Sequence, residues 1–354
     1  MADNRSTLRT SFRWAIFGIL PVWALLSWVT WLFLRPPSSL DVVVYDVTVP
    51  DDRFVEHASL AYLFDHEKIA LDVRYDYVGA APGGAPYGQW PDSPPDLLIL
   101  ADGYGVYADE FGRVSDVGRT RITERLEIVD AERVLAWIEA GTFVVGEFNI
   151  FEDPTVVAAS EILQQPFGVD PVGWTGRYFE DLANVPGGLR VLTGEQWEYE
   201  GPGILLVSGP AGDRSLPAGA IVLSGADLDE PVPRVVGTAP NRWATVHVPF
   251  YAWFEVTEAM PGTEVDAVFE IEVSESGAAL LQAAGVPSRF PALVHNDSTL
   301  YFAGDGLEVV ADFPFHRMVG GPRLIEWARG LPEERLFRKL YLPALSWAIA
   351  QAGD

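Results

Sequence analysis

The sequence predicts an α/β protein with a parallel sheet, a β-rich C-terminal addition and one transmembrane helix before the folded part. Three observations lead to this prediction. Residues 14–34 contain no charged side chain, strand-like and helix-like segments alternate between residues 40 and 170, and short apolar runs between Gly and Pro clusters follow. Strands that alternate with helices indicate a parallel sheet with both faces covered.

Residues 14–34 predict an uncleaved transmembrane signal anchor. A helix of this length matches the roughly 30 Å hydrocarbon core of a bilayer. Three arginines lie in residues 1–13, and the positive-inside rule makes these residues a cytoplasmic tail. The alternative is a cleaved signal peptide, but the segment is long and ends in Arg35 and two prolines. We therefore expect a single-pass protein of the cell membrane with an extracytoplasmic C-terminal domain.

The part from residue 40 to 170 contains the predicted α/β domain. Leu40–Val49 is a β-branched run typical of a buried strand, and Asp51 and Asp52 can cap a following helix. Gly141 suits the C-terminal end of a helix. Further strands are expected at Ala70–Val78, Asp96–Ala101 and Thr142–Gly146, and further helices at Asp130–Ala140 and from Asp153 to Leu163.

The part from residue 171 to 330 is predicted to be richer in strands than in helices. Its expected strands are Ile204–Ser208, Ala220–Ser224, Trp243–Pro249, Val265–Val273 and Ser298–Ala303. The sequence leaves open whether they continue the first sheet or form an added layer, and hence whether there are one or two domains. Residues 331–354 predict a final helix that closes the core through an apolar stripe that includes Leu336, Leu340 and Ala344.

The composition narrows the classes of partner and site. The net charge is −26 at pH 7, and so acidic a chain repels phosphate backbones, which excludes a nucleic-acid partner. Cysteine is absent, so disulfides, thiolate metal sites and a Cys nucleophile are ruled out. The five histidines show no metal-binding spacing. We expect no metal and no cofactor.

Polar and aromatic side chains follow several predicted strands. Ligands of open parallel sheets bind outside the carboxyl ends of the strands, and carboxylates combined with aromatic rings are typical of glycan sites. Each acid has the alternative role of capping a helix or ordering a turn. Paired carboxylates also suit glycoside cleavage, although no catalytic residue is identified. The candidate ligand-binding residues are Asp46, Asp102, Tyr104, Glu147, Asn149, Trp174 and Arg177.

The strands Val42–Asp46, Asp96–Asp102 and Phe143–Asn149, each flanked by helices, resemble the class I glutamine amidotransferase-like fold. That flavodoxin-like layout also occurs as a non-catalytic domain in β-galactosidases of glycoside hydrolase family 42. The chain is also similar to a group of membrane-anchored bacterial proteins that share segments like GEFNIFEDPT (146–155), GWTGRYF (173–179) and YFAGD (301–305). The amidotransferase nucleophile is a Cys after a strand, whereas this chain has Glu147 at the comparable place. The resemblance therefore implies a degenerate, non-catalytic domain.

The sequence thus predicts a membrane-anchored, non-catalytic protein that binds cell-surface glycan or assembles a complex of the cell envelope. Its expected partners are the membrane, through the N-terminal helix, and a glycan or an envelope protein. The alternative is a membrane-tethered carbohydrate hydrolase that uses acidic residues. A third possibility, a structural partner of a membrane complex, would expose an apolar patch instead of a pocket.

Overall fold

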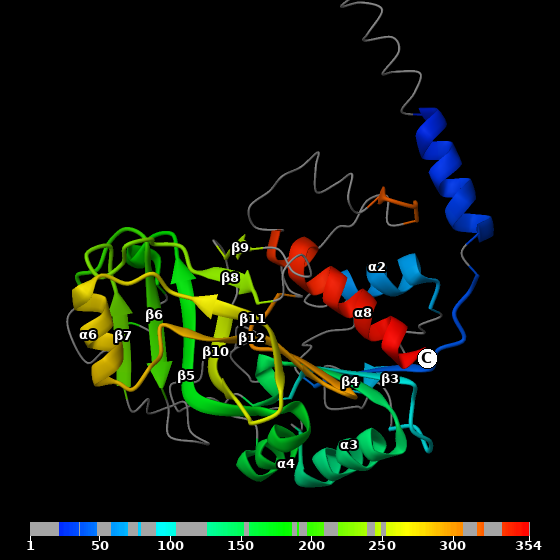
Figure 1. Ribbon diagram of the computed structural model, residues 1–354, viewed down its shortest axis with the longest axis horizontal. Coiled ribbons are helices and arrows are strands. Elements are labelled where there is room, and N and C mark those ends of the chain that lie inside the picture. The colour runs from blue at the N-terminus through cyan, green and yellow to red at the C-terminus, as the bar shows by residue number, and fades with distance from the viewer. Residues whose placement is uncertain are drawn as a thin grey trace, which may run out of the picture.

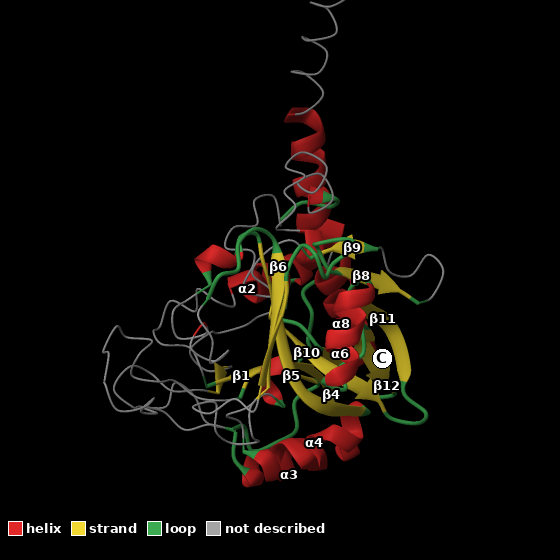
Figure 2. Cartoon of the chain, turned by 90° about the vertical axis from the view of Figure 1, so that its left-hand side faces the viewer, coloured by secondary structure: helices red, strands yellow, loops and turns green. Residues whose placement is uncertain are grey.

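The computed structural model describes residues 21–34, 36–47, 58–69, 77–78, 90–103, 126–151, 156–185, 190, 197–208, 219–238, 245–248, 253–306, 317–321 and 335–353. A mixed sheet of nine described strands forms the centre of the protein, and a four-stranded antiparallel sheet lies at one end of it (Figure 1). Helices α3 (Ile128–Ala140) and α4 (Val157–Phe167) cover one face of the large sheet. Helices α2 (Ala58–Glu67) and α8 (Leu342–Ala352) lie on the opposite face (Figures 1 and 2).

Five strands of the large sheet are parallel. Their order is β2-β1-β3-β4-β13, which corresponds to the flavodoxin-like order with its switch point between β1 and β3. All residues of β1 and β4 are buried, as expected for apolar strands covered by helices on both faces. The bounds are β1 Val42–Asp46, β2 Tyr77–Val78, β3 Leu97–Asp102, β4 Phe143–Glu147 and β13 Thr299–Phe302.

The other half of the large sheet is antiparallel. It continues from β13 through β12 (Arg289–Asn296), β11 (Glu264–Glu270), β8 (Arg234–Gly237) and β9 (Val246–His247). Only Asp297 and Ser298 separate β12 from β13, and so short a connection joins antiparallel strands. Helix α6 (Glu275–Ala283) lies between β11 and β12 in the chain, and Ser274 caps its first turn.

The second sheet has the order β10-β5-β6-β7 and is antiparallel throughout. Its strands are β5 (Val169–Phe179), β6 (Gly203–Ser208), β7 (Gly219–Leu223) and β10 (Trp253–Ala259). Two backbone hydrogen bonds join β10 to the chain just after β13. Glu255 N donates to Ala303 O at 2.8 Å, and Asp305 N donates to Trp253 O at 2.8 Å.

The predicted fold class, a parallel flavodoxin-like or amidotransferase-like sheet with a β-rich addition, was therefore wrong. The large sheet is only partly parallel because β12 returns directly beside β13 through a tight turn. The four strands outside the large sheet, β5, β6, β7 and β10, form a separate antiparallel sheet. The pairing of β13 with β4 and of β5 with β10 joins segments that are distant in the chain, which a reading of local patterns does not fix.

The prediction of a transmembrane helix before this fold was also wrong. Residues 21–34 are helical, and no helix among the described residues has both the length and the apolar character that a membrane span requires. A helix of these residues is about 21 Å long, which is shorter than the roughly 30 Å hydrocarbon core. The predicted membrane partner and the single-pass localisation lose their support with it. Residues 1–20 lie outside the described part of the chain.

Several local predictions are confirmed. Helix α3 ends at Gly141, which adopts a left-handed conformation with φ 106°. The stripe residues Leu336, Leu340 and Ala344 are buried, although the π-helical turn Phe337–Tyr341 precedes the final helix, which begins at Leu342. A short 3-10 turn η2 (Phe148–Ile150) follows β4, and a second, η3 (Leu182–Asn184), follows β5. The predicted helix start at Asp153 lies outside the described residues.

Candidate functional site at the strand ends

The carboxyl ends of β1 and β4 hold two predicted site residues inside the protein. Asp46 ends β1 and is 1% exposed, and Glu147 ends β4 and is 2% exposed. Asp46 is in register with Asp102 of β3, and Glu147 is in register with Phe302 of β13. The strand ends therefore come together as predicted, but neither of these two carboxylates faces solvent.

The remaining candidates are divided between two places. Asp102 and Asn149 belong by their backbone to the same edge, in β3 and η2. Trp174 and Arg177 lie on β5 of the second sheet. Tyr104 lies outside the described residues.

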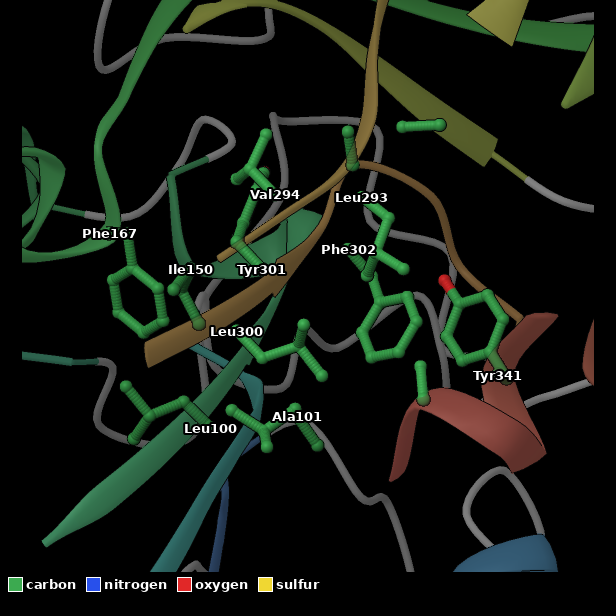
Figure 3. Close-up of a cluster of buried hydrophobic side chains, with 14 of the residues drawn as sticks. Leu100, Ala101, Ile150, Phe167, Leu293, Val294, Leu300, Tyr301, Phe302 and Tyr341 are labelled. Atoms are coloured by element: carbon green, nitrogen blue, oxygen red, sulfur yellow. The ribbon is translucent and has the colours of Figure 1, made fainter. Parts of the chain in front are cut away.

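The C-terminal segment fills the space beyond β4 and β13. A π-helical turn, Phe337–Tyr341, precedes α8 and contains the buried residues Arg338 and Tyr341. The Tyr341 ring stacks on Phe302 with centroids 4.1 Å apart and planes 10° apart (Figure 3). Tyr341 also packs against the backbone of Gly306, where an added Cβ would lie 2.2 Å from the ring. We call this set of five residues, Glu147, Phe302, Asp305, Arg338 and Tyr341, the C-terminal plug.

Two carboxylates of the plug act on the Tyr341 hydroxyl. Burial raises the pKa of Tyr341 well above its ordinary value of 10.0, and the charges of Glu147 and Asp305 raise it further. The Gly306 backbone acts in the opposite direction with a smaller effect. Tyr341 is therefore a neutral hydroxyl at physiological pH, close to two carboxylates.

A second polar group lies where the two sheets meet. The Tyr301 hydroxyl donates to Glu255 Oε2 at 2.6 Å, and both side chains are buried. Glu255 is in register with Thr175 of β5, and the Tyr301 ring lies 5.0 Å from that of Phe151. In Figure 3, Tyr301 lies with Ile150 and Phe167, on the other side of β13 from Phe302. Phe151, Thr175 and Tyr301 therefore lie together near this junction.

Arg177 lies between two aromatic rings on the second sheet. Its guanidinium carbon is 5.0 Å from the Phe179 ring centroid and 5.4 Å from that of Trp253. Trp253 is the register partner of Arg177 across β10 and β5. Cation–π contacts therefore hold the side chain within the protein. A ligand carboxylate at Arg177 stays a prediction.

The comparisons with known proteins show no family. No protein-family model matches the chain, and no curated protein matches it. Among solved structures, α-L-fucosidase isoenzyme 2 from Paenibacillus thiaminolyticus is similar over 88% of this chain and 33% of that chain, with 11% identity and a TM-score of 0.39. The chain spans about a third of the length of that structure. A likeness this distant assigns neither a fold family nor a function.

The sequence analysis did not select several residues of these groups. Asp305 had a signal, because it borders the apolar run that became β13. Glu255 had none beyond its place in a strand, and Arg338 and Tyr341 lie in a segment that reads as an apolar helix. Their partners are far away in the chain, so only the fold brings them together.

One further ionisable pair lies between β11, β12 and α8. His295 Nδ1 is 2.7 Å from Asp266 Oδ2, and His295 Nε2 is 3.6 Å from Glu264 Oε2. The His295 ring meets the edge of Trp347 at 5.2 Å. Among the described residues, no group of three or more His, Asp or Glu side chains is arranged to hold a metal ion. Through the contact between His295 and Trp347, this group packs α8 against the sheet.

Proposed function

We propose that the chain is a non-catalytic assembly protein. One observation carries the proposal. Tyr341 lies beyond the ends of β4 and β13, at the edge where a flavodoxin-like sheet binds its ligand, stacked on Phe302 and close to Glu147. A ligand would reach Glu147 from this side only if Tyr341 were displaced.

Displacing the plug is costly because the segment around it is part of the core. Leu336, Phe337 and Leu340 are at most 3% exposed, and burial of each such side chain contributes about 1.5–3 kcal/mol. The segment is therefore expected to stay in place in the folded protein.

The chemistry of the strand ends also favours a non-catalytic role. An amidotransferase needs a thiolate nucleophile, and the chain contains no cysteine. A carbohydrate hydrolase needs an acid and a second carboxylate that both contact the substrate. Asp46 and Glu147 are buried, so their positions do not support the hydrolase alternative.

Activity measurements on the full chain test this proposal. Aryl glycosides and glutamine are supplied to the wild type, to Glu147→Gln and to Glu258→Gln, a matched control at an exposed position of β10. We expect no turnover in any of the three proteins, and a lower melting temperature for Glu147→Gln alone. The proposal would be overturned if the wild type turned over a substrate and Glu147→Gln did not, while the melting temperature of Glu147→Gln equalled that of the wild type.

A further inference from the structure

The helix of residues 21–34 is fixed to the folded part by one side. Ser27 and Trp31 are 8% and 7% exposed. Trp31 Nε1 donates to His66 O at the end of α2 at 2.9 Å, and Lys68 Nζ donates to Leu32 O at 2.8 Å. Lys68 also lies 4.6 Å from the Trp31 ring centroid. These contacts present the opposite side of the helix to solvent in a defined orientation (Figure 2).

That opposite side is apolar. It consists of six large side chains that are between 38% and 75% exposed, namely Val22, Leu25, Leu26, Trp28, Leu32 and Phe33. We call this set the helix face. Soluble monomers rarely expose a continuous apolar patch of this kind, and such patches mark interaction sites.

The spacing of the helix face fits another helix. Val22, Leu25, Val29 and Leu32 follow the alternating spacing of three and four residues that forms the seam of a coiled coil. Leu26 and Phe33 widen this seam on one side. The same helix in a second copy offers an identical seam, and a two-fold axis makes the two self-complementary.

Area and charge favour a second copy as the occupant. If each of the six side chains loses roughly 100 Å², the two copies together bury about 1,200 Å², which is at the lower end of the range for stable interfaces. A standard interface buries about 800 Å² per partner. The chain carries a net charge of −26, whereas residues 21–34 contain no charge. Two copies therefore approach here with the least repulsion.

We propose that the helix face pairs with the helix face of a second copy of this chain and forms a symmetric dimer. The proposal goes beyond the non-catalytic role of the strand ends, since the plug contributes nothing to it. Sedimentation of the full chain in detergent-free buffer tests it. We expect the wild type to be a dimer. The Leu25→Glu/Leu32→Glu variant should dissociate at a concentration about 100-fold higher than the wild type does.

Leu280→Glu is the matched control, because Leu280 is a 43% exposed leucine on α6. This control should remain a dimer. Because the chain has no cysteine, single Cys variants at positions 25, 29 and 32 give a second test that needs no destabilising charge. At least one of them should form a disulfide-linked dimer on oxidation, whereas Leu280→Cys should not.

Three results would overturn the proposal. They are a monomeric wild type at every concentration, a Leu25→Glu/Leu32→Glu dimer that dissociates at the same concentration as the wild type, or cross-linking at Leu280→Cys that equals cross-linking on the helix face. A monomer that associates only with phosphatidylcholine vesicles would identify a lipid surface as the occupant instead.

Discussion

Replacing Tyr341 with Phe should make the protein less sensitive to alkaline pH while it preserves the packing of the plug. Phe keeps the ring that stacks on Phe302 at 4.1 Å and removes only the hydroxyl. The pKa of that hydroxyl is raised well above 10.0, first by burial and then by the charges of Glu147 and Asp305. The variant therefore isolates the effect of one ionisable group.

The direction of the pH effect on stability follows from the ionisation of Tyr341 in the unfolded and in the folded protein. In the unfolded chain the hydroxyl ionises with a pKa of 10.0, whereas the folded protein holds the proton to higher pH. Its contribution to stability is complete below pH 10 and is lost as the pH rises toward the folded pKa. At about pH 11 the ionisation of the unfolded chain lowers the free energy of unfolding by about 1.4 kcal/mol.

Urea unfolding at neutral pH and at about pH 11 measures this difference. The wild type should lose about 1.4 kcal/mol more than Tyr341→Phe between the two conditions. Tyr178, whose pKa is raised by burial and by Glu180, is present in both proteins, so its contribution cancels. Equal losses in the two proteins would refute a Tyr341 hydroxyl buried beside two carboxylates.

Two further substitutions test the junction of the sheets. Tyr301→Phe removes the 2.6 Å donor to the buried Glu255 and should lower the free energy of unfolding by about 1.5–3 kcal/mol; an unchanged urea midpoint would contradict the bond. Gly176→Ala places a Cβ 2.3 Å from the Phe254 ring and should cost about 1–3 kcal/mol. Gly225→Ala, which meets nothing within 4 Å, should stay within about 0.5 kcal/mol. Equal melting temperatures for the two alanine variants would show free space beside Phe254.

The sequence predicted the elements whose causes are local. The β-branched run over Val42–Asp46 became a fully buried strand, and Gly141 ended α3 in the conformation that glycine favours. Leu336, Leu340 and Ala344 are buried as the stripe of the final helix requires. In each case the signal lies within one or two turns of chain.

The rest of the fold depends on pairings between segments that are distant in the chain. Nothing in the sequence of β10 shows that Glu255 bonds to Ala303 and links the two sheets. An uncharged apolar run indicated a bilayer span, but the same run also suits a helix that packs Trp31 against the end of α2. An apolar run indicates that its side chains will be removed from water, but it does not show whether lipid or protein will cover them.

The sequence predicted that Asp46 and Glu147 lie at the same edge of the sheet, but it did not predict that both are buried. The strand order correctly brings Asp46 and Glu147 to one edge of the sheet, since carboxyl ends of parallel strands share an edge. The packing of Tyr341 close to Glu147 could not be predicted, because Tyr341 comes from a segment that reads as an apolar helix.

The measurement that tests the central claim most directly is a crystal structure of the full chain grown with a mixture of short oligosaccharides. The claim is that the protein's own side chains fill the strand ends. It predicts Tyr341 stacked on Phe302, with no ligand density at the ends of β1, β3 and β4. Oligosaccharide density in contact with Glu147, with Tyr341 displaced, would contradict it.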